Sequence, residues 1–287
     1  MKKLLKSAFL NIHSYPKDDI SLYIRNGLEF FKETGFETAA IGTKALVPAS
    51  GQWQPVVEQA LKDAAEVGMP FSDCHLPYFN IKVNTDPVYA EECKQSMFTA
   101  IDIAKTLGAR TAVLHPNCAT VTERAYDKAQ AYDAAMAHLA PFAEYAAKLG
   151  VPVLVENTRL VPGIRQSTRY CQGPEELCEL ADALDFGICW DFGHANLAGL
   201  KQSQALAYVG TRLKAVHVHD NNGTDDDHTA PFMGSVDWAD AMHGLALAQF
   251  DGPLNYEVKA GQVPAGLRKD FAKYLVAAAD QLMELIV

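Results

Sequence analysis

Four side chains that commonly bind metal ions come at the ends of four successive apolar runs of the chain. Such short runs, rich in Val, Ile and Leu, are typical of buried parallel strands. Carboxylates and imidazoles are ligands for hard or borderline divalent cations. Because a buried carboxylate is costly unless it is paired or bound to a cation, we predict a metal site where these strand-end residues meet: Glu156, Asp191, His217 and Glu257.

A second group of ligand-type side chains ends other apolar runs or lies in the loops beside them. Taken singly, a histidine at a strand end is more often a hydrogen-bonded structural residue than a ligand. An acidic run such as residues 225–227 is more often a solvated loop. These side chains and the strand-end residues all lie at the ends of predicted strands or in the loops that follow them, which favours a shared site. We call these five the outer residues: His75, His115, His194, Asp226 and His228.

His217 and His219 occupy one predicted strand. Because side chains alternate between the two faces of a strand, we expect only one of the two histidines to point with the ligands at the same level, and we favour His217. Asp220, which follows them, is expected to form local hydrogen bonds.

Eight apolar runs alternate with amphipathic stretches, several of which end in a glycine, the residue that most easily terminates a helix. This alternation implies a parallel α/β fold, and eight units favour a closed (β/α)8 barrel over an open sheet. We predict a single domain, residues 1–287, with strands at 6–12, 38–42, 71–76, 111–115, 151–156, 186–191, 215–219 and 254–258. The clearest helices are predicted at 21–34, 56–67, 89–107, 125–148 and 265–285.

Length and composition limit the classes of protein that this chain represents. Its 287 residues and 49% hydrophobic content suit one globular domain, and a net charge of −10 argues against a broad nucleic-acid footprint. No apolar run is long enough to cross a membrane. Six cysteines without a CxxC pair indicate reduced thiols and a cytoplasmic location. The apolar residues 282–287 suit either an interface in a homo-oligomer or the last barrel helix.

Several short motifs together resemble one superfamily, the xylose isomerase-like TIM barrels, over almost the whole chain. This superfamily contains sugar isomerases, sugar epimerases and the endonuclease IV type of DNA repair enzyme. As a set the motifs are specific for the superfamily, but they are much less specific for one reaction. They are His75-Leu-Pro-Tyr78, Val155-Glu-Asn157, Asp191-Phe-Gly-His194, His217-Val-His-Asp220, Asp226-Asp-His228 and Tyr256-Glu257.

The resemblance implies one of two metal centres. In the epimerase and isomerase members, the positions of the strand-end residues hold one divalent ion, which can be manganese, magnesium, cobalt or zinc. In the endonuclease IV-like members, three zinc ions use these positions together with those of the outer residues. Every ligand type of the larger set is present in this chain.

The favoured function is a metal-dependent isomerase or epimerase of a sugar, a keto sugar or a sugar phosphate. The metal would bind the carbonyl oxygen, lower the pKa of the neighbouring carbon acid and stabilise an enediolate. Glu156 and Glu257 are predicted to act as the acid/base pair. The outer residues are predicted to bind substrate. Arg159, and with it Lys259, would bind a phosphate or carboxylate unless they are solvated rim charges. Trp190 would stack on the sugar ring unless it packs in the core.

Two other classes of function remain open on the sequence. The first is an endonuclease IV-like zinc phosphodiesterase acting on abasic DNA, although residues 43–53 lack the arginines that such enzymes insert into DNA. The second is a non-catalytic barrel that binds a metal or a sugar. Dehydration or carbon–glycoside cleavage would begin with the same proton abstraction as epimerisation, and the sequence does not separate them. Residues that mark particular sugar subtypes are also missing, which leaves the substrate open.

Overall fold

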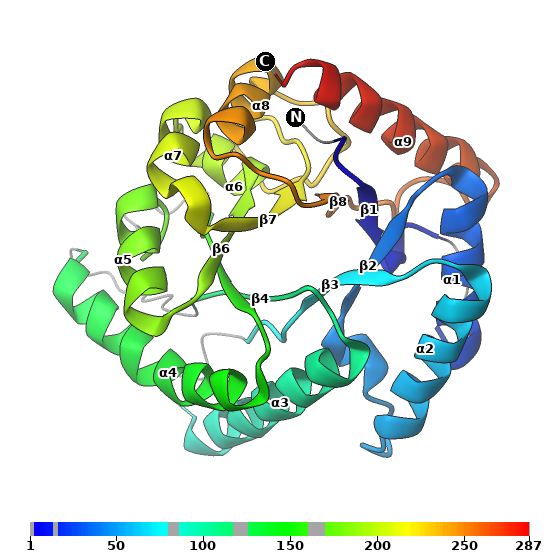
Figure 1. Ribbon diagram of the computed structural model, residues 1–287, viewed down its shortest axis with the longest axis horizontal. Helices are drawn as coiled ribbons and strands as arrows, with labels where there is room; N and C mark the ends of the chain where they lie inside the picture. The colour runs from blue at the N-terminus through cyan, green and yellow to red at the C-terminus, as the bar shows by residue number, and fades with distance from the viewer. Residues whose placement is uncertain (1–2, 14–16, 80–85, 117–125, 160–169, 287) are drawn as a thin grey trace.

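Eight parallel strands close into a barrel, and the helices form a ring around it (Figure 1). The computed structural model describes residues 3–13, 17–79, 86–116, 126–159 and 170–286. The order of the strands around the barrel follows the chain, and the last strand pairs with the first. The predicted (β/α)8 barrel is therefore confirmed.

The strands are short, apolar and almost entirely buried, as expected for parallel strands that are covered by helices on the outside. Each of the eight predicted strands is present. The first strand ends earlier than predicted because a short 3-10 helix, η1 (Leu10–Ile12), begins directly after it. The strands are β1 (Lys6–Phe9), β2 (Thr38–Gly42), β3 (Phe71–His75), β4 (Thr111–Leu114), β5 (Val153–Glu156), β6 (Gly187–Asp191), β7 (Leu213–Val218) and β8 (Leu254–Tyr256).

The helices have clear start and stop signals. In α1, the Asp19 side chain accepts a hydrogen bond from the backbone N–H of Leu22, and the helix ends at Gly35, whose φ of 103° suits only glycine well. The five predicted helices are confirmed with ends shifted by three residues or fewer, although Ala125 lies outside the described residues. The helices are α1 (Ile20–Thr34), α2 (Gln54–Val67), α3 (Pro87–Leu107), α4 (Lys128–Leu149), α5 (Pro174–Leu184), α6 (Phe192–Leu197), α7 (Gln202–Val209), α8 (Trp238–Leu247) and α9 (Arg268–Glu284).

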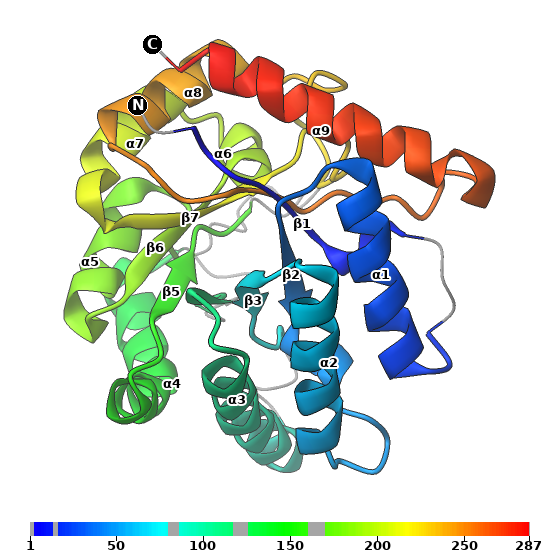
Figure 2. The same ribbon diagram turned by 45° about the vertical axis from the view of Figure 1, so that its right-hand side comes forward.

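The last helix completes the outer ring. Figure 2 shows α9 beside α1, so that the first and last βα units lie next to each other. The C-terminal apolar stretch belongs to this packing, since Leu282 is fully buried. Residues 282–284 of this stretch thus belong to the last helix, residues 285–286 follow it, and residue 287 lies outside the described residues. A homo-oligomer stays a prediction.

Strand register fixes the depth of each side chain in the barrel. Asp191 of β6 is paired with His217 of β7, and Cys189 is paired with Ala215 two residues earlier on each strand. Cys189 and Ala215 belong to a small buried apolar cluster inside the barrel. Because residues two apart on a strand face the same side, this apolar layer lies directly below the layer that contains Asp191 and His217.

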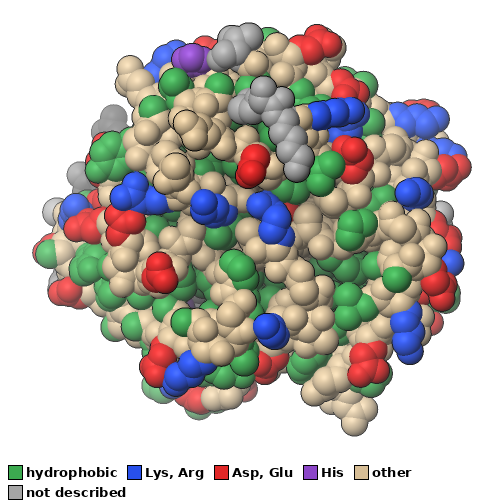
Figure 3. All heavy atoms as spheres, viewed as in Figure 1, with side chains coloured by type: hydrophobic (Ala, Val, Ile, Leu, Met, Phe, Trp, Pro, Cys, Tyr) green, Lys and Arg blue, Asp and Glu red, His purple; other side chains and the backbone are tan. Residues whose placement is uncertain are grey.

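The distribution of charged side chains on the surface and the burial of the cysteines are those of a packed globular domain. In the face shown in Figure 3, positive and negative side chains are interspersed, and histidine is visible only near the rim. No helix within the described ranges is long and apolar enough to span a bilayer. Four cysteines of the described segments are buried and free, namely Cys74, Cys93, Cys178 and Cys189; Cys171 is also buried, and Cys118 lies outside the described segments. The cytoplasmic location stays a prediction.

The loop after β7 is organised by one buried carboxylate, that of Asp220. It accepts hydrogen bonds from the backbone N–H groups of Asn221, Phe232 and Val236 at 2.9–3.1 Å, and from the indole N–H of Trp238 at 2.9 Å. The expectation of local hydrogen bonds at Asp220 is confirmed and extended, because the bonds reach to the start of α8. This carboxylate therefore holds in place the loop that carries two of the outer residues.

We predict that Asp220→Ala lowers the free energy of unfolding by about 3 kcal/mol or more, because it leaves three buried donors and one partly buried donor without an acceptor. Urea denaturation of the metal-free protein measures the effect. Asp220→Asn, which retains one acceptor oxygen, should lose less. Asp251→Ala, at an exposed aspartate, is the control and should stay within about 0.5 kcal/mol of the wild type. A loss in Asp220→Ala no larger than in the control would contradict this role.

Candidate metal and active centre

The strand-end residues converge at one end of the barrel. Glu156 and Asp191 are the last residues of β5 and β6, His217 is the penultimate residue of β7, and Glu257 follows β8. Each offers one ligand atom, and these four atoms all lie within 4.8 Å of one another. Four consecutive parallel strands therefore bring three carboxylates and one imidazole to a single point.

His217 lies between the two glutamates. Its Nδ1 atom is 3.1 Å from Glu156 Oε1 and 3.1 Å from Glu257 Oε2. Glu156 and His217 are at most 1% exposed, yet among the described residues both carboxylate oxygens of Glu156 and both ring nitrogens of His217 lack a hydrogen bond of good geometry. Buried polar atoms in proteins almost always have such a partner. A divalent cation fits these atoms, since it would satisfy them together.

Electrostatics keep the carboxylates of this centre ionised. Burial raises the pKa of Glu156, but its interactions with His217 and His115 outweigh burial and hold that pKa well below its usual value. The pKa of Asp191 is lowered in the same way by His194 and His219, and that of Glu257 by His217. In the metal-free protein, protonated imidazoles thus supply positive charge that a cation would supply when bound.

His75 and His115 approach Glu156 from β3 and from the end of β4. Their Nε2 atoms are 3.4 Å and 3.3 Å from Glu156 Oε2 and 3.1 Å from each other. The Nδ1 atom of His75 bonds the carbonyl of Leu76 at 2.6 Å, which leaves Nε2 facing the carboxylate. Burial works against protonation of both rings. Interactions with Glu156 and Glu257 outweigh it at His75, whose pKa is raised, whereas the pKa of His115 is lowered.

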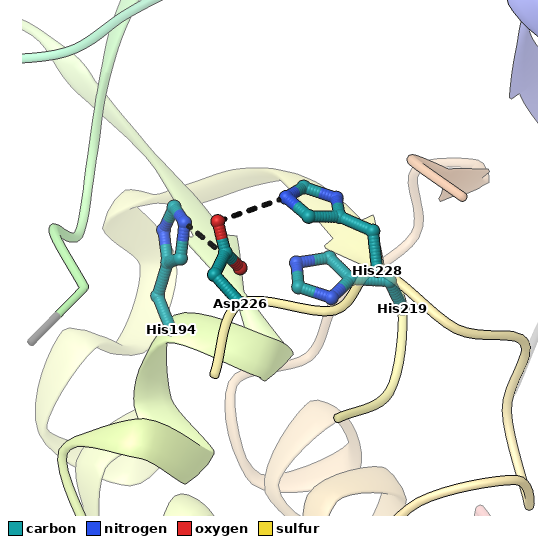
Figure 4. Close-up of side chains that lie close together, drawn as sticks. All are labelled: His194, His219, Asp226 and His228. Carbon is teal, nitrogen blue, oxygen red and sulfur yellow. Dashed lines mark hydrogen bonds and ion pairs between the residues drawn. The ribbon is translucent and has the colours of Figure 1, made fainter. Parts of the chain in front are cut away.

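The remaining outer residues form a second group together with one unexpected residue. In Figure 4 the Asp226 carboxylate lies between the rings of His194 and His228, and the His219 ring lies below that of His228. Asp226 Oδ2 is 3.1 Å from His228 Nε2, and Asp226 Oδ1 is 3.9 Å from His194 Nε2. This group of four could also hold a metal ion, since its ligand atoms lie within 4.8 Å of one another: His194, His219, Asp226 and His228.

Backbone carbonyl groups orient two of these imidazoles. The Nδ1 atom of His194 bonds the carbonyl of Asn157 at 2.8 Å, and that of His228 bonds the carbonyl of Glu257 at 2.7 Å. Such bonds fix the tautomer and leave Nε2 to face a ligand. His228 also has a positive φ of 50°, an unusual conformation for a side chain of this size. Burial lowers the pKa of His228, but the hydrogen bond to Asp226 raises it to about 9.

The alternation argument that was used to separate the two histidines of β7 is wrong, although only His217 lies at the level of Asp191. Alternation along a strand places residues two apart on the same face, so His217 and His219 both point inwards, at successive depths. His219 is fully buried, and its Nε2 atom is 2.9 Å from Asp191 Oδ2. Gly193 makes room for the ring, because a Cβ atom there would lie 2.0 Å from it. Correct use of the two-residue period would have found His219 in the sequence.

Trp190 lies in the core, not at the site. It is fully buried, and its indole N–H donates to the side-chain oxygen of Gln202 at 3.1 Å. The predicted stacking of Trp190 on a sugar is therefore corrected to core packing, because no substrate can reach its ring. Side chains alternate between the two faces of a strand, so Trp190, which precedes the inward-facing Asp191, points outwards to the helices.

The two cations that follow the ligand glutamates both contact Asp226. The Arg159 Nε atom is 3.4 Å from the Asp226 carboxylate, and the Lys259 ammonium donates to the Asp226 backbone carbonyl at 2.6 Å. Arg159 also lines a small cavity of about 200 Å³ together with His115, His194 and His228. Arg159 thus lies at the rim of the site, where its charge is partly offset by Asp226.

A larger cavity of about 700 Å³ opens on the other side of the centre, towards β1, β2 and β3. His75, His115 and Glu257 form its inner end. A volume of this size lies within the usual range for small-molecule sites. Because Glu257 lines both cavities, its carboxylate stands where a ligand in either one would meet the strand-end residues.

Comparison with known proteins gives a consistent result. The model of the xylose isomerase-like TIM barrel family matches residues 28–278. The uncharacterized protein MJ1311 of Methanocaldococcus jannaschii is 26% identical over 91% of this chain and 88% of its own length. Among solved structures, a D-tagatose 3-epimerase-like protein superimposes with a TM-score of 0.75 at 18% identity over 98% of both chains. D-psicose 3-epimerase of Clostridium cellulolyticum H10, solved with D-tagatose, gives 0.76 at 13% identity over 98% of this chain and 99% of its own.

We predict that metal binding releases protons and strengthens as pH rises. The pKa of His217 is well above its usual value in the metal-free protein, so the ring is protonated at neutral pH, whereas a ligand imidazole must be neutral. Lower pH therefore favours the proton over the metal. Calorimetric titration of chelator-stripped protein with Mn²⁺ between pH 6.5 and 8.5, in buffers of different ionisation enthalpy, counts the protons. The exposed-histidine variant His243→Gln should behave as the wild type, and pH-independent uptake without proton release would contradict the prediction.

Proposed function

This chain belongs to the xylose isomerase-like TIM barrel family, and we propose that it is a divalent-metal-dependent isomerase or epimerase of a sugar or keto sugar. The observation that carries the proposal is the convergence of the four strand-end ligand atoms within 4.8 Å beside a cavity of about 700 Å³. The keto-sugar epimerases among the similar structures support the choice of substrate class.

The strand-end residues would hold the ion. Three carboxylates and one imidazole suit manganese, magnesium, cobalt or zinc. When bound, such an ion supplies Lewis-acid stabilisation of negative charge that develops on substrate oxygen atoms. The chain's own contribution is to place a proton acceptor and a proton donor next to the reacting carbon.

Glu156 and Glu257 are the proposed acid/base pair. Both carboxylates approach the same nitrogen of His217, and both have lowered pKa values, so that each is ionised and able to accept a proton at neutral pH. One glutamate would remove the proton from the carbon beside the carbonyl group. The other would return a proton that it has first taken up from water, which gives the epimer when it acts on the opposite face.

The outer residues would position the substrate. His194 is held by Asn157 so that its Nε2 atom faces the small cavity, where it can hydrogen-bond a substrate hydroxyl or oxyanion. His228 and Arg159 line the same cavity. These groups can bind the polar edge of a sugar while the two glutamates act on the carbon.

We predict that Glu156→Gln and Glu257→Gln each abolish epimerisation, at least a thousandfold, while the barrel stays folded. If the two glutamates act on opposite faces, each variant should still exchange the proton of one epimer with D2O without converting it. Turnover and NMR-monitored exchange on a keto-sugar panel measure this, with metal content and circular dichroism recorded for each variant. Glu58→Gln, at an exposed glutamate of α2, is the control. Near-normal epimerisation by either variant would exclude that glutamate.

A second candidate function, an endonuclease IV-like zinc phosphodiesterase, is favoured by one observation. Two further groups of ligand-type atoms adjoin the strand-end residues: one joins His75 to Glu156 and His217, and the other is the group in Figure 4. Several zinc ions in such groups could activate water and stabilise a leaving oxygen. The net charge of −10 speaks against a broad DNA-binding surface.

Metal stoichiometry separates the two candidates. We predict about one divalent ion per chain by elemental mass spectrometry of protein purified without added metal or affinity tag. About three zinc ions per chain, with a loss in His219→Gln, would instead favour the phosphodiesterase, and cleavage of abasic DNA would establish it. Metal and sugar binding without turnover of any substrate would point to a non-catalytic barrel.

A further inference from the structure

The larger cavity has two chemically different ends. Its inner end is formed by His75, His115 and Glu257, at the metal centre. Its outer end lies over the segments that follow β1 and β2, where Lys17 and Lys44 form part of the lining. Apart from the residues of the centre, these two lysines are the charged side chains among the described residues that line the cavity.

The walls between the two ends are mainly apolar. Phe9, Ile41, Leu76 and Tyr78 contribute to them. At Gly42, a Cβ atom would have no neighbour within 4 Å, so the cavity is open at that point. The cavity therefore offers space and apolar surface for a carbon skeleton that extends from the metal centre to the lysines.

The charges of the two lysines are not neutralised by carboxylates. Lys17 and Lys44 are both exposed, and neither forms an ion pair with a carboxylate of the described segments. Other lysines of the chain do form such pairs, as Lys6 does with Asp280. The Lys17 ammonium lies 5.5 Å from the centre of the Tyr23 ring, a contact that orients the side chain and keeps its charge.

The cations on the opposite side of the centre differ in this respect. Arg159 and Lys259 both contact Asp226, through its carboxylate and its backbone carbonyl. An anionic group on a ligand would have to compete with Asp226 there. At the outer end of the larger cavity it would meet two lysines that form no ion pair with a carboxylate of the described residues.

We propose that the substrate is an anionic sugar whose phosphate or carboxylate group is bound by Lys17 and Lys44, while its carbonyl end lies at the metal centre. This inference rests on the proposed function for the role of the inner end. The lysines act as specificity-determining residues, since they contact the part of the substrate that does not react. Binding energy gained there favours anionic over neutral sugars and fixes which end of the molecule reaches the glutamates.

The test compares neutral sugars with sugars that carry an anionic group at the carbon farthest from the reacting end. D-fructose, D-psicose and D-tagatose are each paired with their 6-phosphates, and D-fructuronate supplies a carboxylate at the same carbon as the phosphate. Calorimetry on the manganese-loaded protein measures dissociation constants, and turnover is recorded separately. The variants are Lys17→Gln, Lys44→Gln and the double substitution, with Lys62→Gln on the exposed face of α2 as the matched control.

We expect at least one anionic sugar to bind ten times or more tightly than its neutral partner, with the advantage weakened by added salt. The advantage should fall about tenfold in each single variant and disappear in the double variant, while affinity for the neutral sugar is unchanged. A bulky side chain in Gly42→Leu should weaken binding of the phosphates more than that of the free sugars. The phosphate and carboxylate arms identify which group the lysines prefer.

Two results would overturn the inference. One is equal or no binding of neutral and anionic sugars by the wild type, and the other is an anion preference that persists in the double variant. Failure of the proposed function has a different signature. Lysine-dependent binding of anionic sugars without turnover would support the cavity and refute the isomerase. Turnover of neutral sugars without anion preference would do the reverse.

Discussion

The buried carboxylate of Glu156 is the constraint on which the site depends. It is 1% exposed, and four imidazoles approach within 3.1–3.5 Å of its oxygen atoms. An ionised carboxylate without water or hydrogen-bond donors is strongly destabilising unless positive charge stands beside it. Either protonated histidines or a bound cation can supply that charge, and the arrangement of the centre follows from the need to compensate the Glu156 carboxylate. The imidazoles around it are those of His75, His115, His194 and His217.

Barrel geometry arranges the compensating groups in layers. Because inward-facing residues recur every second position, β7 contributes His217 at the level of Asp191 and His219 at the next level. Below them, Cys189 and Ala215 fill the interior with small apolar groups. The same register that packs the barrel thus sets the depth of the candidate metal centre and places an apolar layer beneath it. Asp220, just beyond His219, then holds the loop that carries His228 and Asp226.

The sequence was sufficient to predict the barrel and the strand-end residues, because both follow from local patterns: apolar runs, glycine helix ends, and ligands at the ends of runs. It was not sufficient where the result depends on contacts between distant segments. Trp190 looks like a sugar-stacking residue until its bond to Gln202 is seen. Arg159 looks like a free cation until Asp226 is found beside it. His219 was missed because the two-residue period of the strand was misapplied, although the sequence contained the information needed to place it beside His217.

The two ends of the larger cavity have opposite electrostatic requirements. With its carboxylates ionised, the strand-end set carries an excess of negative charge that protonated histidines only partly offset. An anionic ligand entering from the lysine end would be repelled by this charge if no cation were present. A bound divalent ion would reduce the repulsion and also hold the carbonyl end. Under the proposed function, metal occupancy would therefore affect the affinity for an anionic substrate as well as the chemistry of the two glutamates.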